Sequence, residues 1–321
     1  MVVNRFGALL PSWPEVRAAV RRLWVPGNPP PAQRPEPPDE DLVDLLSDPF
    51  ESTGDALDRL ATAELRLRSL DDRRAVFLTV YTRMTEQVQA EIDSGGFENP
   101  AWIADYLVSF ANAYRRAFVA YERGDYDAVP APWRVAFDAS LTGDTLVLQD
   151  ALLGVNAHIN YDLAYTLDEV GIDPDRETRH TDHDHVDAIL ADLIDVVQET
   201  LVDVYDAIGV PSADAILGDL DEQGMLLGLT EGRAFAWANA VVLADIPAPF
   251  TRRFVDWRLR TVSLGVAQLV RSASLDEYTR SQIRSLEQDS NAASTVATQL
   301  DATISRPTTV GSGPSVPDAD S

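Results

Sequence analysis

Residues 99–124 read NPAWIADYLVSFANAYRRAFVAYERG, and this stretch indicates the fold class. Large aromatic side chains recur in it every three or four residues: Trp102, Tyr106, Phe110, Tyr114, Phe118 and Tyr121. This spacing is that of one face of an α-helix with 3.6 residues per turn. Asn99-Pro100 is typical of a helix start and Gly124 of a helix end. The stretch therefore predicts one long helix with an aromatic face that packs into a core.

The segments around this helix repeat at the same period, and alternating runs typical of strands are absent from the sequence. We therefore expect an all-α, single-domain bundle of about nine or ten helices over residues 41–288. A short helix segment is expected in residues 1–25, where Trp13–Trp24 is amphipathic. Residues 26–40 hold seven prolines within thirteen positions and predict a Pro-rich linker. Residues 289–321 have the Ser, Thr, Ala, Gly and Pro composition of a disordered tail.

The charge of the chain is strongly negative. Its 321 residues hold 52 Asp and Glu against 26 cations, all of them Arg, which gives a net charge of −26. A surface of this kind predicts a halophilic, cytoplasmic protein, because molar salt screens the self-repulsion. The same field repels nucleic acid, so no nucleic-acid partner is expected. No apolar run reaches the roughly 18 residues of a membrane span.

The absence of two residue types from the sequence excludes several kinds of site. With no cysteine there is no disulfide, thiolate nucleophile or thiolate metal site. With no lysine there is no phosphate-binding Gly-Lys-Ser/Thr turn and no Schiff base. We therefore expect no nucleotide cofactor, and any metal must be held by His, Asp, Glu or Asn.

The four histidines, at positions 158, 180, 183 and 185, lie within 28 residues of one another. His158 and Asp162 are four residues apart in a predicted helix over residues 145–170, so their side chains lie on one side of it. His183 and Asp187 repeat the spacing in the next predicted helix, residues 182–208. Because a short loop makes successive helices antiparallel, the two pairs are expected at a common level.

This arrangement predicts a site for one divalent metal, zinc, manganese or iron, with His158, Asp162, His183 and Asp187 as ligands. A metal-bound water could then attack an ester, amide or phosphate, which makes a metal-dependent hydrolase the leading prediction. His158 and Asp162 would be catalytic, and Arg233 would hold a small anionic or lipid-like substrate. Four further residues are expected around the site: Asn156, Asn160, Asp182 and Trp237.

Two other interpretations stay open. The same residues could form a buried hydrogen-bond network in a non-catalytic binding or structural protein. Two histidines and one carboxylate could instead hold the iron of a non-haem oxygenase. Substrate, oligomeric state and the role of the N-terminal helix are not indicated by the sequence.

The segment Asn156–Leu163, NAHINYDL, resembles the core motif of an uncharacterised family of haloarchaea and actinobacteria, the DUF5995 type. Three further segments support the resemblance: Phe110–Tyr114 (FANAY), Val129–Trp133 (VPAPW) and the pair Arg233 and Trp237. The resemblance implies importance for His158, Asn160 and Asp162. It implies less for His183, which stands where the family has an aromatic residue, and it brings no activity.

Overall fold

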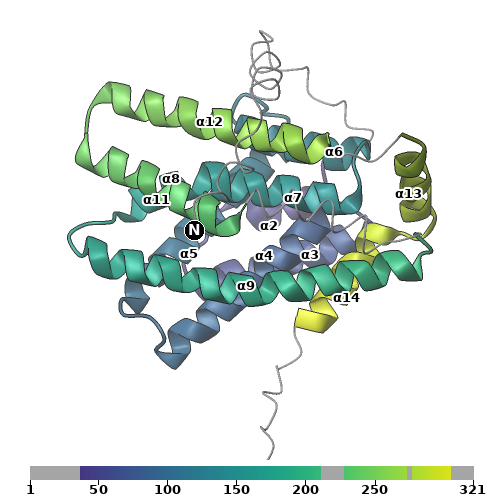
Figure 1. The fold of residues 1–321 in the computed structure, drawn as a ribbon, viewed down its shortest axis with the longest axis horizontal. Helices are drawn as coiled ribbons and strands as arrows, with labels where there is room; N and C mark the ends of the chain where they lie inside the picture. The colour runs from purple at the N-terminus through teal and green to yellow at the C-terminus, as the bar shows by residue number, and fades with distance from the viewer. Residues whose placement is uncertain (1–36, 211–227, 273–276, 305–321) are drawn as a thin grey trace, which may run out of the picture.

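The computed structural model describes residues 37–210, 228–272 and 277–304, and in these residues it is entirely helical (Figure 1). The described part holds twelve α-helices, one π-helical turn and no strand. This confirms the predicted all-α bundle, with a helix count slightly above nine or ten. The elements are α2 (Glu40–Ser47), α3 (Thr53–Ser69), α4 (Arg74–Ser94), α5 (Pro100–Glu122), α6 (Ala131–Thr142), α7 (Val147–Ala157), η1 (His158–Asp162), α8 (Leu163–Val170), α9 (Arg176–Ala207), α11 (Leu229–Asp245), α12 (Pro249–Arg271), α13 (Glu277–Asp289) and α14 (Ala292–Ile304).

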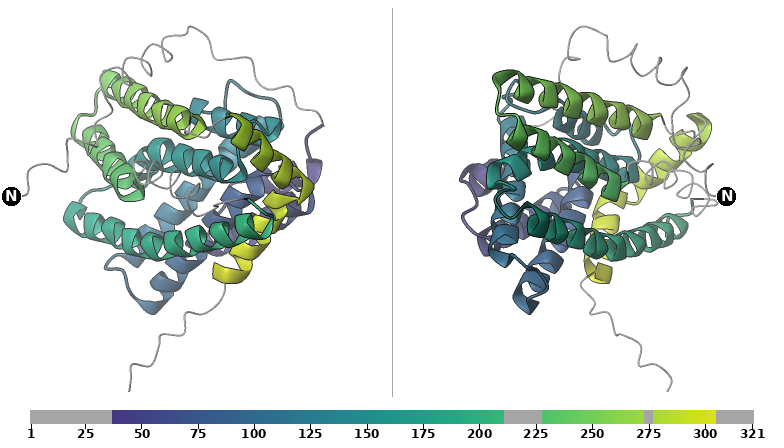
Figure 2. Two further views of the ribbon diagram at one scale, coloured as in Figure 1. Left: turned by 45° about the vertical axis from the view of Figure 1, so that its right-hand side comes forward. Right: turned by 60° about the vertical axis from the view of Figure 1, so that its left-hand side comes forward.

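Helices α7 and α8, joined by the π turn η1, form one continuous helix through the middle of the molecule. This central helix contacts α4, α5, α6, α11 and α12. The long helix α9 lies below it and helix α12 above it in Figure 1 and in both views of Figure 2. A side chain at the π turn is therefore surrounded by protein.

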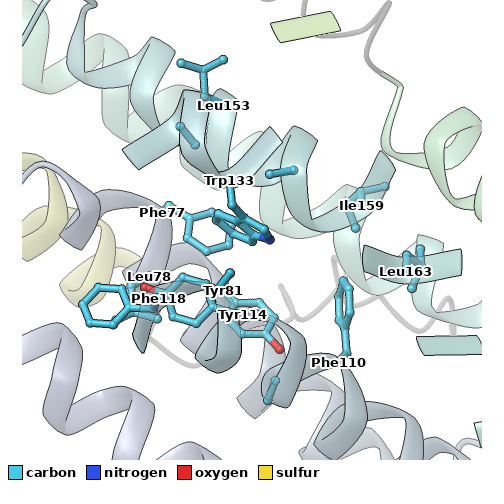
Figure 3. Close-up of a cluster of buried hydrophobic side chains, with 14 of the residues drawn as sticks. Phe77, Leu78, Tyr81, Phe110, Tyr114, Phe118, Trp133, Leu153, Ile159 and Leu163 are labelled. Atoms are coloured by element: carbon cyan, nitrogen blue, oxygen red, sulfur yellow. The ribbon is translucent and has the colours of Figure 1, made fainter. Parts of the chain in front are cut away.

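Helix α5 carries the aromatic face that its sequence predicted. Asn99 caps the helix by accepting a hydrogen bond from Trp102 N at 3.2 Å, and Pro100 occupies the first turn. The six aromatic side chains of the predicted face are all buried. Figure 3 shows Tyr114 beside Phe77 and Trp133, from α4 and α6, with Phe110 farther along α5. The core thus forms where aromatic residues of three helices converge.

The C-terminal boundary of the domain is a correction. Residues 289–321 were expected to form a tail, yet residues 292–304 form helix α14, which buries Val296, Ala297 and Leu300 against α4 and α9. Its small side chains allow close packing but give little hydrophobic signal in the sequence. Residues 305–321, the predicted helix at Trp13–Trp24 and most of the Pro-rich linker lie outside the described residues.

None of the described helices combines the length and the apolar character needed to cross a lipid bilayer.

Candidate functional site

The π turn His158–Asp162 brings the first predicted pair together. Leu163 N donates to His158 O, five residues back, which widens this turn relative to the α-helix on either side. In a turn of more than four residues, positions four apart lie almost directly above one another. The His158 Nδ1 atom accordingly lies 3.1 Å from Asp162 Oδ2, with both side chains buried.

The proton of His158 can be placed from its partners. Asp162 Oδ2 also accepts a hydrogen bond from Trp133 Nε1 at 2.7 Å, so its oxygen already acts as an acceptor. A carboxylate cannot donate, so the ring proton of neutral His158 lies on Nδ1. The Nε2 atom then carries a free lone pair, and it has no hydrogen-bond partner among the described residues. This is the arrangement of a histidine oriented by a carboxylate.

Aromatic rings enclose His158. The Phe110 ring stacks on the imidazole, with centroids 3.5 Å apart and planes at 4°, and the Tyr81 ring meets it edge-on at 4.6 Å. Only 2% of His158 is exposed. Burial lowers the pKa of His158 below its usual value, although the carboxylate of Asp162 partly offsets that shift. The imidazole is therefore neutral at pH 7 and its Nε2 atom is a potential base.

The second predicted pair, His183 and Asp187, is held by Arg233. The Arg233 Nε atom pairs with Asp187 Oδ1, and Arg233 Nη2 donates to the backbone oxygen of His183 and lies 3.2 Å from its Nδ1 atom. The Tyr106 hydroxyl lies 3.2 Å from the same Nδ1 atom. Helices α5, α9 and α11 thus meet at this cluster, where Arg233 is buried and makes an ion pair with a half-buried carboxylate.

The proton of His183 lies on the opposite nitrogen from that of His158. A guanidinium only donates, so Nδ1 of His183 accepts and its proton lies on Nε2. Burial and the nearby Arg233 charge both lower the pKa of His183 well below its usual value, so the ring is neutral. Its Nε2 atom, now a donor, also has no hydrogen-bond partner among the described residues. One histidine therefore offers an acceptor and the other a donor.

Three of the expected surrounding residues join these clusters. Asn160 Nδ2 donates to Asn156 Oδ1 at 3.0 Å, and Asn156 Nδ2 donates to Ser263 O on α12 at 2.9 Å. These bonds tie the π turn to α12. The Trp237 ring packs against His183 with centroids 5.2 Å apart.

Asp182 has a different role from the one expected. Helix α9 begins at Arg176 rather than at residue 182, so Asp182 lies within its second turn. Its two carboxylate oxygens accept from Glu98 N and Asn99 N at 2.8 and 2.7 Å, which fixes the start of α5. Asp182 therefore positions the aromatic helix and contacts neither histidine cluster directly.

The remaining two histidines lie at the surface. His180 is partly exposed and pairs with Asp184 at 3.3 Å, and His185 pairs with Glu91 at 3.0 Å. Exposed pairs of this kind contribute little to stability.

The four predicted metal ligands fall into two clusters. Asp162 accepts from Trp133 and His158, whereas Asp187 pairs with Arg233. Across the residues that the structure describes, no three His, Asp or Glu side chains are grouped so that they could hold one metal ion. The donor His183 ring and the adjacent guanidinium also disfavour a dication at the second cluster.

Helix α5 connects the two clusters. The Tyr106 ring stacks on His183 with centroids 6.0 Å apart and lies 6.2 Å from Phe110, which stacks on His158. Tyr106 and Phe110 are four residues apart, a rise of about 6 Å. Sequence reasoning assigned Tyr106 and Trp133 no role at the site, although the four-residue spacing already placed Tyr106 and Phe110 on one face.

Comparison with known proteins gives a family without a function. No curated protein and no solved structure matches the chain. A model described as a family of unknown function, DUF5995, matches residues 53–273, which include both clusters. Because that match covers more than half of the chain, this protein is a member of the DUF5995 family.

Proposed function

We propose that the protein is a hydrolase in which the Asp162–His158 pair acts as the general base. The proposal rests on the Nε2 atom of His158, which is buried and has no hydrogen-bond partner among the described residues. The other ring nitrogen, Nδ1, lies 3.1 Å from the buried carboxylate of Asp162. Buried polar atoms without a partner are rare in folded proteins, and each calls for a water or a ligand. An imidazole held in this way takes up the proton of an attacking water or hydroxyl.

The chemistry follows from the two oriented rings. As water attacks an ester or amide carbon, its proton passes to His158 Nε2, and the carboxylate of Asp162 stabilises the imidazolium that forms. When the tetrahedral intermediate breaks its bond to the leaving alcohol or amine, the imidazolium gives that proton to the leaving group and the acid product remains.

The substrate we propose is small and anionic, because the second cluster offers donors: the Nε2–H group of His183 and the buried charge of Arg233. The reacting bond of such a substrate would lie at His158, beside Phe110, and its anionic group at His183, beside Tyr106. These two positions are about one helical turn apart along α5.

Metal-dependent hydrolysis is the first competing proposal. It requires the ion pair between Arg233 and Asp187 to open so that a carboxylate becomes available beside an imidazole. Elemental analysis of the purified protein tests it. About one equivalent of zinc or manganese that is lost in His158→Ala would favour this mechanism, whereas iron would favour an oxygenase.

A non-catalytic network is the second competing proposal. Its support is that Trp133, Asp162, His158, Asn156 and Asn160 are all buried and mostly bonded to one another. Such networks fix helix register in a core. Under this proposal His158 affects stability and nothing else.

Hydrolysis of a panel of p-nitrophenyl esters, with carboxylate-bearing acyl groups among them, separates these proposals. We expect activity that depends on a neutral His158, is lost in His158→Gln, is reduced in Asp162→Asn, and is retained in His185→Gln, which removes a half-exposed histidine paired with Glu91. Wild-type protein without activity above the buffer rate, combined with a destabilised His158→Gln variant, would favour the network. We place the reaction in a cytoplasm of high salt, on the basis of the −26 charge and the absence of lysine.

A further inference from the structure

Helix α12 carries charge of the opposite sign to the rest of the protein. Its 23 residues contain five arginines and a single acid, Asp256, in a chain whose net charge is −26. Asp256 is half-buried at the border of the inner side, where it accepts hydrogen bonds from Tyr161 and Tyr165 at 3.1 Å each. Arginines therefore outnumber acids on the exposed side of α12, in contrast to the rest of the protein.

The same outward side carries a row of exposed aromatic residues. Phe250, Phe254 and Trp257 are 69%, 49% and 61% exposed, and at about 100° per residue they fall within about 60° of one another around the helix. Large apolar side chains normally avoid such exposure when they are grouped. Ile246, at 48% exposure, lies just before the helix and extends the row.

Two arginines flank this row on one side. Arg253 and Arg260 are exposed and lie along one edge of the helix beside it, and Arg271 lies on the same edge but about 21 Å beyond Trp257 along the axis. Arg260 lies 3.9 Å from Asp256, and within the described residues neither Arg253 nor Arg271 has an ion-pair partner. The other two arginines are engaged, Arg252 with Asp168 and Arg258 with Asn239.

Among the residues that the structure describes, no element covers this side of α12. Its inner side, with Val255, Leu259 and Ser263, is buried against the body, and the helix runs along the upper edge of the molecule (Figures 1 and 2). The face therefore stands out from the protein on the side opposite α9.

From this combination we propose that the outer face of α12 docks the protein on an anionic phospholipid bilayer. Tryptophan and phenylalanine favour the interfacial region of a bilayer, and arginines beside them bind lipid phosphates. The net charge of −26 repels an anionic surface at long range, as it repels nucleic acid, so this docking depends on short-range contacts in which the aromatic side chains enter the interface, a step that nucleic acid does not offer. A second copy of the same face is disfavoured, because both surfaces are basic. The segment Trp13–Trp24 of this chain is disfavoured as an occupant for the same reason, since it contains Arg17, Arg21 and Arg22. The proposal does not depend on chemistry at His158.

Co-sedimentation of the full chain with vesicles tests the proposal. At 0.15 M salt we expect binding to phosphatidylglycerol vesicles that exceeds binding to phosphatidylcholine vesicles by about tenfold or more. The variant Phe254→Ser/Trp257→Ser should lose about tenfold of this binding. Arg253→Gln/Arg260→Gln should remove the preference for the anionic lipid while part of the aromatic contribution remains.

The matched control is Leu65→Ser/Leu70→Ser on α3, which removes exposed apolar side chains elsewhere and should leave binding unchanged. Circular dichroism and thermal unfolding confirm that each variant is folded. Three results would overturn the proposal: no binding of the wild type to anionic vesicles, equal binding by the α12 aromatic variant, or loss of binding only in Trp13→Ser/Trp24→Ser. Preferential α12-dependent binding to polyglutamate or to an oligonucleotide would assign the face to another partner and would also overturn it.

Discussion

Replacing Asp162 tests the proton assignment on which the proposed chemistry depends. In Asp162→Ala, Trp133 Nε1 and His158 Nδ1 lose an acceptor at 2.7 and 3.1 Å. A buried donor without a partner costs about 1–3 kcal/mol, so two of them predict a loss of about 2–6 kcal/mol in the free energy of unfolding. Moving the His158 proton to Nε2 does not relieve the penalty, because that atom has no hydrogen-bond partner among the described residues either, so the expected loss is about 4 kcal/mol, the middle of that range.

Asp162→Asn should cost about 1 kcal/mol, because Oδ2 of Asp162 meets both Trp133 and His158 and the amide oxygen can take its place as the acceptor for both. The ring proton of His158 then stays on Nδ1, and the base is weakened because a neutral amide no longer stabilises the imidazolium. Urea unfolding measures the free energies, and ¹⁵N chemical shifts of the imidazole report which nitrogen is protonated. The control is Asp184→Ala, which breaks an exposed pair of the same spacing and should cost less than about 0.5 kcal/mol. A loss in Asp162→Ala no larger than that of the control, or a wild-type His158 protonated on Nε2, would refute the reasoning.

Three further predictions concern stability. Gly232→Ala should destabilise the protein by about 1–2 kcal/mol in urea unfolding, because the new Cβ would lie 2.9 Å from Ile159 Cγ2. Gly265→Ala, with open space around it, should stabilise by about 0.5–1 kcal/mol, and the opposite order would contradict the packing described. Because the folded-state pKa of His183 is depressed, the unfolded chain binds its proton first, and stability should fall below about pH 6.5. His183→Gln should reduce this slope by up to about 1.4 kcal/mol per pH unit. The contribution of His183 is the difference between the free energies of unfolding of wild type and variant at each pH. Burial also raises the pKa of Asp150 to about 6, which contributes a slope of opposite sign, and this contribution cancels in the difference. Finally, thermal unfolding should move to higher temperature as KCl rises from about 0.1 M to about 1 M, since the Debye length falls from about 10 Å to about 3 Å. An unchanged or lower unfolding temperature would argue against salt adaptation.

The sequence predicts the helical architecture well because the apolar period is local. Helix α5 could be placed within two residues from its aromatic row, its Asn-Pro start and its Gly end. Helix α14 could not, since Ala292, Ala293 and Ala297 are buried through small side chains whose packing depends on α4 and α9. Composition alone does not distinguish such a helix from a solvated tail.

The candidate site could be predicted only in part. The spacing of His158 and Asp162 placed them together, as they are in the structure. The π turn that carries both residues has no recognisable pattern in the sequence, because NAHINYDL also fits an ordinary α-helix. The third member, Trp133, comes from α6, and its bond to Asp162 depends on how distant helices pack. Likewise, Asp187 is paired with Arg233 from another helix, 46 residues away, which no local pattern indicates.

The widened turn at residues 158–162 has a consequence for how the central helix could have arisen. A π turn takes up one inserted residue while the helix on either side keeps its phase, so Leu153 before it and Leu163 after it both stay buried. A chain one residue shorter at this point could fold into the same bundle as an uninterrupted α-helix. A four-residue pairing of imidazole and carboxylate does not itself need the π turn, since His180 and Asp184 pair at the same spacing within α9. The inserted residue instead enlarges the surface that the central helix presents to α5, α11 and α12 at this turn.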